Sequence, residues 1–352
     1  MSYEAGIAAL HLEMPDVVPR TEYSVEEHWP LIRQVTGYPV TSASPEDEKK
    51  KAQAAFFKAW DYGINWNILV HNNYLTGRKT SMGHAVYAEG GSDFQEAAGC
   101  PFRTPKEALA FEPAEEYGIP NHQALVSQFN ANWRTKCDTF DDTVNMTGIY
   151  ITLMSGLIEL LGWDMLLLSA GTDPADFGAL ANRYADWIAH HFEALAACDS
   201  PVVMVHDDIV WTEGAFLHPD WYRNYIFPNY KRLFAPLREA GKIILFTSDG
   251  NYTQFIDDIA QTGVNGFVME PCTDMAYLAE RYGKTHVLVG NADTRVLLSG
   301  SREQIYSEVK RCMDIGKSCP GFILAVGNHI PPNTPVEAAL YYNECYEQLR
   351  RR

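Results

Sequence analysis

The sequence predicts an α/β protein in which eight parallel strands alternate with helices, as in a (β/α)8 barrel. Short runs of β-branched and apolar residues recur along the chain, helical patterns separate them, and most of the runs end in polar residues. Such alternation is typical of a parallel sheet, because parallel strands need a crossover between them. The count of eight favours closure, and 352 residues suit one barrel that carries an insertion.

The expected strands extend over the whole chain. Continuous apolar content in the later ones is typical of strands that are buried on both faces. An open, doubly wound sheet is the alternative architecture, and it is disfavoured because no glycine-rich phosphate turn follows the first strand. We place the strands at residues 17–23, 64–70, 146–153, 202–205, 243–246, 266–269, 286–289 and 322–326.

Helical spacing of apolar residues fills most of the intervals between these strands. Residues 74–143 are too long for a simple connection and contain Gly, Pro and aromatic residues throughout, so we expect a lid or cap over the barrel mouth there. No repeat or Pro-rich linker divides the chain, so residues 1–352 are expected to form one domain. The expected helices are 46–62, 157–170, 183–197, 221–240, 252–261, 275–282 and 301–315.

Composition disfavours several classes of partner and location. A formal charge of −17 is unsuited to binding nucleic acid, which requires a basic surface. No stretch approaches the ~20 apolar residues of a membrane span, and no basic segment of a signal peptide is evident at the start. The seven cysteines are scattered without a CxxC pair, which indicates reduced thiols and a cytoplasmic location.

Polar residues follow five consecutive strands, at the end where the pocket of a (β/α)8 barrel forms. Asp, Asn and Gly are also ordinary residues for ending a strand and capping the next helix. His or Glu at three of the five ends is less easily explained in that way, because neither is a favoured turn residue. The segments are 206–208, 248–251, 269–270, 290–293 and 327–329.

The strand ends supply two imidazoles and two carboxylates, which would suit a catalytic Zn²⁺ with an open position for substrate. These side chains are those of His206, Asp249, Glu270 and His329. The alternative is that the two histidines only donate hydrogen bonds to nearby carboxylates. Without a cation, buried acids would raise each other's pKa and support general acid–base chemistry instead.

The C-terminal part of the chain resembles the uroporphyrinogen decarboxylase superfamily. The resemblance is carried by GNAD at 290–293, LLSGSRE at 297–303, GFIL at 321–324 and IPPNTP at 330–335, and more loosely by PDVVP at 15–19. It implies a (β/α)8 barrel that is either a tetrapyrrole decarboxylase or a corrinoid-linked methyltransferase.

The arginine-rich segment that such decarboxylases carry after the first strand is missing from this sequence. Residues 20–27 hold one Arg among three acids, which cannot neutralise a substrate with many carboxylates. Methyltransferases of the superfamily that act on thiols hold zinc with an H-x-C-G-N motif and a later Cys or His. Those positions fall on Thr247, Asp249 and Asn328 here, so the thiolate-type site is absent.

The resemblance therefore implies the ether-cleaving type, in which zinc polarises a methyl ether and a corrinoid protein accepts the methyl group. For that type, a carboxylate-x14-Glu-x20-His spacing is reproduced by Asp293, Glu308 and His329. Our own placement of Glu308 in the middle of a helix, away from the mouth, argues against its role.

We therefore expect a methyltransferase that moves a methyl group from a methoxylated substrate, aromatic or not, or from an N-methyl substrate to a corrinoid protein, with zinc as cofactor. The alternatives are a decarboxylase or lyase acting on a small acid, and a non-catalytic corrinoid- or tetrapyrrole-binding protein. We assign Asp207, Asp249 and Asn291 to catalysis, His206, Glu270, Asp293 and His329 to the metal, and His71, Tyr74, Tyr150 and Trp211 to the substrate.

Overall fold

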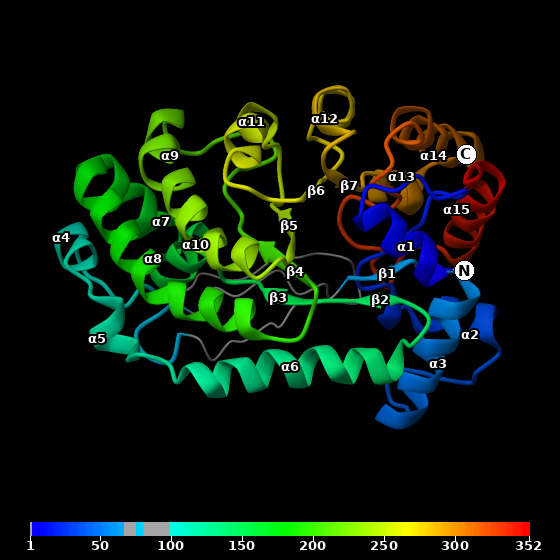
Figure 1. Cartoon of the computed structure of the whole chain (residues 1–352), viewed down its shortest axis with the longest axis horizontal. Coiled ribbons are helices and arrows are strands. Elements are labelled where there is room, and N and C mark those ends of the chain that lie inside the picture. Colours follow the sequence, from blue (N-terminus) through cyan, green and yellow to red (C-terminus); the bar gives the residue numbers. More distant parts are fainter. Residues whose placement is uncertain (1, 67–74, 81–98) are drawn as a thin grey trace.

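The computed structural model describes residues 2–66, 75–80 and 99–352. Within these residues helices separate most of the eight short strands, and every pair of hydrogen-bonded strands is parallel. Figure 1 shows the helices arranged around the strands. The strands are β1 (Ile64–Asn65), β2 (Val144–Asn145), β3 (Thr147–Ile149), β4 (Val202–His206), β5 (Ile243–Thr247), β6 (Gly266–Val268), β7 (Val287–Val289) and β8 (Phe322–Ile323).

The strands form a two-stranded sheet of β1 and β2 and a six-stranded sheet in which β3 to β8 follow in chain order. Only Met146 separates β2 from β3, so one extended segment pairs first with β1 and then with β4. The predicted α/β class with a parallel sheet is confirmed. Neighbouring strands in chain order, joined by helices, are consistent with a (β/α)8 barrel.

The first expected strand, residues 17–23, is present only as single-residue bridges. Arg20 bridges in parallel to Tyr62, which precedes β1, and to Leu324, which follows β8. Pro19 has no N–H to donate, which keeps this ladder short. The segment therefore lies between the outer strands of the two sheets.

Alternate strand residues face two different apolar clusters. Met204 of β4 and Leu245 of β5 belong to an inner cluster, whereas Val205 and Phe246 pack with the helices in a larger outer cluster. Successive strand side chains point to opposite faces, so each position can be assigned to the inside or the outside. The inner cluster comprises Ala9, Leu10, Ile64, Val144, Met146, Val202, Met204, Leu245, Val268, Val287, Val289, Ile323 and Ala325.

Several helices begin where a side chain accepts their free N–H groups. Asp173 caps α8 by accepting the N–H groups of Ala175 and Asp176, and Ser301 forms a capping box with Gln304 in α14. The helices are α1 (Ser2–Leu10), α2 (Trp29–Thr36), α3 (Glu46–Ala59), α4 (Pro105–Leu109), α5 (Pro113–Tyr117), α6 (His122–Thr139), α7 (Met154–Thr172), α8 (Pro174–Ala197), α9 (Pro219–Tyr225), α10 (Phe227–Glu239), α11 (Ile256–Ala260), α12 (Met275–Tyr282), α13 (Thr294–Ser299), α14 (Arg302–Gly316) and α15 (Val336–Leu349), with 3-10 turns at Val25–Glu27 and Thr253–Phe255.

The region expected to form a cap, residues 74–143, is described in part. Its last helix, α6, packs against α8 and β3, and Trp133 Nε1 donates to the carbonyl of Asn145 at 3.2 Å. Thus α6 occupies the place of the crossover helix between β1 and β2, whereas α4 packs on α7 and α8, and α5 on α8. A cap over the mouth stays a prediction, because residues 74 and 81–98 lie outside the described residues.

Within the described residues, α7 is the one helix that is long and apolar enough to cross a membrane by length and composition. Seventy-two per cent of its most apolar window is buried inside the fold. It is interrupted at Gly162, which has φ 67°. This burial is that of a helix in the core of the domain.

Candidate active site

The polar residues that follow β4 and β5 face the interior at the carboxyl end of the strands. Met204 and Leu245, two positions before His206 and Thr247, belong to the inner cluster. Because strand side chains alternate between the two faces, His206 and Thr247 also face the interior, and they are partners in the parallel register. Asp208 and Asp249 follow two positions later in each segment. This is the end of the strands at which barrel enzymes carry their active sites.

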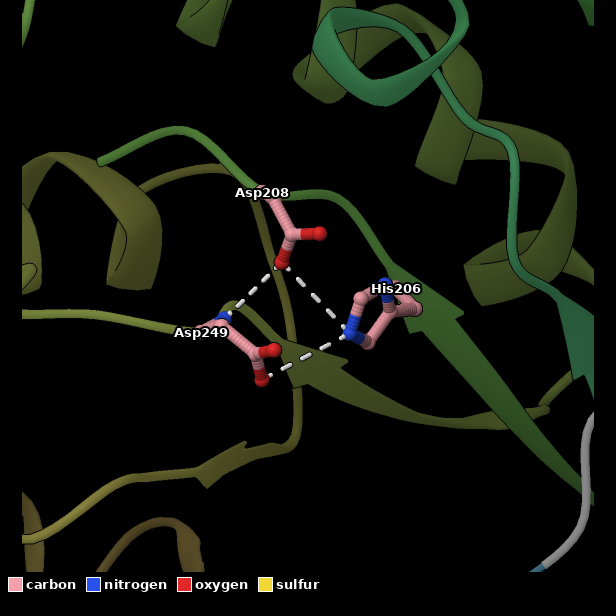
Figure 2. A group of neighbouring side chains, drawn as sticks. All are labelled: His206, Asp208 and Asp249. Carbon is pink, nitrogen blue, oxygen red and sulfur yellow. Dashed lines mark hydrogen bonds and ion pairs between the residues drawn. The ribbon is translucent and has the colours of Figure 1, made fainter. Parts of the chain in front are cut away.

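His206, Asp208 and Asp249 form a compact group (Figure 2). His206 Nε2 lies 3.5 Å from Asp208 Oδ1 and 3.9 Å from Asp249 Oδ1. The N–H of Asp249 donates to Asp208 Oδ1 at 3.0 Å, which holds the loop after β5 against the loop after β4. One potential ligand atom from each residue lies within 4.8 Å of the other two. In the part of the chain that the structure describes, no other group of three His, Cys, Asp or Glu meets this spacing.

The charges in this group influence one another strongly. Burial opposes the charged form of His206, but the carboxylates of Asp208 and Asp249 outweigh it and raise the pKa of His206 to about 9. Burial and the Asp249 carboxylate raise the pKa of Asp208 to about 7, against the attraction of His206. The imidazole is stacked on the ring of Tyr150, with centroids 4.0 Å apart and planes at 14°. The group therefore offers one oriented imidazole and two carboxylates to a cation.

Glu270, which follows β6, lies beside this group and has partners of its own. Its Oε2 accepts the N–H of Gly250 at 2.7 Å, and its Oε1 accepts Nδ2 of Asn328 at 2.5 Å. Burial and the Asp249 carboxylate raise the pKa of Glu270. Gly250 has φ +83°, and a Cβ there would lie 2.7 Å from the carbonyl of Trp211, so this turn requires glycine.

Asp207, which the sequence assigns to catalysis, is fully buried and contacts α7 instead of the group. Its carboxylate accepts the N–H groups of Leu153 at 3.2 Å, Met154 at 3.0 Å and Ser155 at 2.6 Å, together with the hydroxyl of Tyr230. Burial raises the pKa of Asp207, and these donors oppose the rise. These contacts are those of a positioning residue that satisfies the start of α7.

Asn291, also assigned to catalysis, is likewise buried and held by its neighbours. Its Nδ2 donates to the carbonyls of Glu270 at 3.2 Å and Thr273 at 3.3 Å. Its Oδ1 accepts from Arg311 at 3.0 Å, and Arg311 also pairs with Glu308. Asn291 therefore ties the loop after β7 to the loop after β6.

Like Glu270, two further residues assigned to the metal, His329 and Asp293, are not part of the group of three. The ring nitrogen Nδ1 of His329 lies 2.7 Å from Ser24 Oγ. The Asp293 carboxylate is bound by Arg295 at 2.9 and 2.7 Å, and although burial opposes ionisation, Arg295 lowers the pKa of Asp293. Glu308 accepts the N–H of Asp293 at 2.9 Å. Two of the three residues in the carboxylate-x14-Glu-x20-His spacing therefore lie in contact.

Two of the four residues assigned to the substrate are described. Tyr150 contacts the imidazole as above, and Trp211 is 46% exposed, with its ring centroid 5.4 Å from that of Trp163. His71 and Tyr74 lie outside the described residues.

Three inward-facing residues are missing from the residues assigned from the sequence. Asp208 shares the face of His206, and the two-residue period of a strand is the signal that could have singled it out. Tyr23 packs against the inner cluster, and Thr247 faces it at the end of β5. Both hydroxyls are buried and have no hydrogen-bond partner in the described part of the chain. Since an unpaired buried hydroxyl costs free energy, they are suited to a bound group or an ordered water.

The sequence is similar to those of curated uroporphyrinogen decarboxylases. It is 27% identical to the enzyme of Syntrophotalea carbinolica over 176 residues, which is 50% of each chain. It is 26% identical to that of Citrifermentans bemidjiense over 256 residues, which is 72% of each chain. The chain thus spans about half the length of the first of these relatives.

The fold has a solved counterpart in a methyltransferase from Methanosarcina mazei. The TM-score is 0.65 at 17% identity, and the likeness covers 99% of this chain and 98% of the other. A likeness at this identity shows a shared fold. Residues 123–348, from α6 to α15, match the family "Uroporphyrinogen decarboxylase (URO-D)". The chain therefore belongs to the uroporphyrinogen decarboxylase family.

Proposed function

We propose that the protein is a methyltransferase that takes a methyl group from a methoxylated or N-methyl substrate and passes it to a corrinoid protein. The observation that carries the proposal is the charge of the site, where the carboxylates of Asp208 and Asp249 lie beside one imidazole and the Glu270 carboxylate lies close enough to Asp249 to feel its charge. A tetrapyrrole with many carboxylates would be repelled by these groups unless cations were placed among them. A neutral or cationic methyl donor suits this charge better.

The arginines of the neighbouring segments already have carboxylate partners, which supports the same choice. Arg20 is fully buried with its Nη2 2.7 Å from Glu22 Oε1, and Arg295 binds Asp293. Arg311 is paired with Glu308 in the same way. Binding a polyanionic substrate through any of these three arginines would require breaking an existing ion pair.

In the proposed reaction the bond between the methyl carbon and its oxygen or nitrogen breaks. The electron pair of that bond stays on the leaving atom, which takes up a proton, and the methyl group goes to the reduced cobalt of the corrinoid protein. A zinc ion held at the site would supply Lewis-acid polarisation of the leaving atom. The buried hydroxyls of Tyr23 and Thr247 would hydrogen-bond to the bound substrate, and Tyr150 would keep the plane of the His206 ring fixed.

A cytoplasmic location forms part of the proposal. It is supported by the seven cysteines, all of which are free, as expected of thiols in a reducing compartment.

The test is methyl transfer itself. Purified protein is mixed with a reduced corrinoid protein and a panel of methoxylated arenes and methylamines, and methylation of cobalt is followed by absorbance. We expect methylation with at least one donor. Asp249→Asn should slow it by about tenfold or more, since each ~1.4 kcal/mol of barrier is a factor of ten. The matched control is Asp220→Asn, which changes an exposed aspartate of α9.

Two outcomes would contradict the proposal. Decarboxylation of uroporphyrinogen or of a small carboxylic acid by the same preparation, without methylation of cobalt across the panel, would establish a decarboxylase instead. Tight binding of the corrinoid protein with neither reaction would favour the non-catalytic alternative.

A further inference from the structure

We infer that His206, Asp208 and Asp249 are the ligands of one zinc ion, bound between the ends of β4 and β5. The inference deepens the proposed function and rests on it for what the ion activates. The ligand assignment rests on geometry, and zinc binding is measured without methyl transfer.

The three potential ligand atoms lie within 4.8 Å of one another, close to the spacing that a small ion requires. Zinc–nitrogen and zinc–oxygen bonds are roughly 2.0–2.2 Å long, so the ligand atoms of a tetrahedral site lie roughly 3.3–3.6 Å apart. His206 Nε2 lies 3.5 Å from Asp208 Oδ1 and 3.9 Å from Asp249 Oδ1, and Figure 2 shows the side chains pointing toward one another. A small movement of Asp249, whose side chain is 50% exposed, completes the spacing. With a neutral imidazole, two carboxylates balance the charge of Zn²⁺.

Neighbouring groups hold the three residues in this orientation. Tyr150 stacks on the imidazole of His206 at 4.0 Å, and the N–H of Asp249 donates to Asp208 Oδ1 at 3.0 Å. The backbone N–H of Asp208 in turn donates to Ser155 Oγ at 2.8 Å. Outer contacts of this kind orient the ligands at metal sites and strengthen binding.

A buried hydroxyl at the same place points independently to a bound group. Thr247 is the register partner of His206 and faces the interior, with 7% of its surface exposed. Its Oγ1 has no hydrogen-bond partner among the described residues. A three-ligand zinc site keeps a position open for water or substrate, and an oxygen bound there would satisfy this hydroxyl.

Two carboxylates of the alternative ligand set, which the family spacing suggests, already form ion pairs with arginines. The carboxylates of Asp293 and Glu308 are neutralised by Arg295 and Arg311. Zinc bound there would have to displace two guanidinium groups, each held by charge-assisted hydrogen bonds. The ion pairs at the ends of β4 and β5 instead join the imidazole to the two carboxylates, and a neutral imidazole can ligate zinc together with them.

The experiment measures zinc binding by the full-length protein after its metal has been removed with a chelator. Zinc content is measured by mass spectrometry, and affinity by competition with a chromophoric chelator. We expect one zinc per chain, and an affinity loss of at least about 10- to 100-fold in His206→Ala and Asp249→Asn, since losing even an outer contact costs that much. The matched control is His218→Ala, which removes an imidazole from an exposed pair with Asp220 at 3.7 Å and should bind zinc normally.

A second measurement separates loss of ligands from loss of the fold. Asp249→Asn is nearly isosteric and changes a half-exposed side chain, so far-UV circular dichroism should be unchanged. Substitution of zinc by cobalt(II) should give a spectrum of nitrogen and oxygen ligation. Thiolate charge-transfer bands, which ligation by the nearby Cys272 would produce, should be absent.

The outcomes decide the inference separately from the proposed function. Zinc lost in His329→Ala and Asp293→Asn, but retained in Asp249→Asn, would overturn the ligand assignment. Folded wild-type protein that binds no zinc would also overturn it and leave His206 as a salt-bridged imidazolium. Zinc bound with the expected dependence on His206 and Asp249, without methyl transfer to any corrinoid protein, would support this inference and contradict the proposed function.

Discussion

Replacing Asp207 by alanine should destabilise the fold, because this carboxylate holds the start of α7 and its described contacts include no group of the candidate metal site. It is fully buried and accepts three backbone N–H groups together with the hydroxyl of Tyr230. The substitution removes all four contacts and leaves the donors buried. Each unsatisfied buried donor costs about 1–3 kcal/mol, and partial entry of water offsets part of the sum. We expect the free energy of unfolding to fall by about 3–5 kcal/mol.

Urea denaturation, followed by tryptophan fluorescence and far-UV circular dichroism, measures this loss. The neighbouring Asp208→Asn is the matched variant, because Asp208 lies in the same loop with a side chain that is 27% exposed. It should change the free energy of unfolding by less than about 1 kcal/mol while weakening zinc binding. Wild-type stability in Asp207→Ala, together with loss of methyl transfer, would refute the positioning role and return Asp207 to catalysis.

Three further changes test other parts of the fold. Glu22→Ala should lower the free energy of unfolding by about 3–5 kcal/mol in urea, because it leaves a buried guanidinium without its carboxylate; an unchanged transition would contradict this. Gly250→Ala should lower both the melting temperature and the zinc affinity, because φ is +83° and the added methyl meets backbone; a wild-type titration curve would show that the turn adapts. Burial opposes ionisation of Asp61, but hydrogen bonds from Ser2 and Arg350 lower its pKa in the folded protein. The Asp61 carboxylate therefore stabilises the fold at pH values above its pKa in the unfolded chain, and this stabilisation is lost as the pH falls through its pKa in the folded chain. The unfolding free energies of wild type and Asp61→Asn should therefore converge below about pH 4, and a constant difference would count against this.

The later strands could be predicted because their signal is local. The strands expected at 202–205 and 243–246 are observed as β4, Val202–His206, and β5, Ile243–Thr247, since continuous apolar runs mark strands that are buried on both faces. Residues 17–23 differ in this respect. Their pairing partners near β1 and β8 are brought together only by the whole fold, and Pro19 shortens the ladder.

In the candidate site, too, the residues with a local sequence signal could be predicted, whereas contacts that depend on the whole fold could not. His206 was marked by its place at a strand end, and strand alternation then separates Asp208, which shares its face, from Asp207, which contacts α7. No local pattern indicates that His329 contacts Ser24, because 305 positions of chain separate the two residues. The same holds for Asn291, whose amide is held by a guanidinium from a later helix.

The residues behind the site explain how an acidic cluster keeps its shape. Asp207 fixes the end of β4 to α7, Asn291 joins the loops after β6 and β7, and Glu22 Oε2 accepts the N–H of Val326, after β8, at 2.9 Å. Each contact is made to backbone groups that cannot move independently of the fold. The loops that carry the carboxylates of Asp208 and Asp249 are therefore held close together, and the site is largely organised before a ligand arrives. A bound cation relieves the repulsion between these carboxylates in the folded chain only, which is why stability and cation binding should be linked at this site.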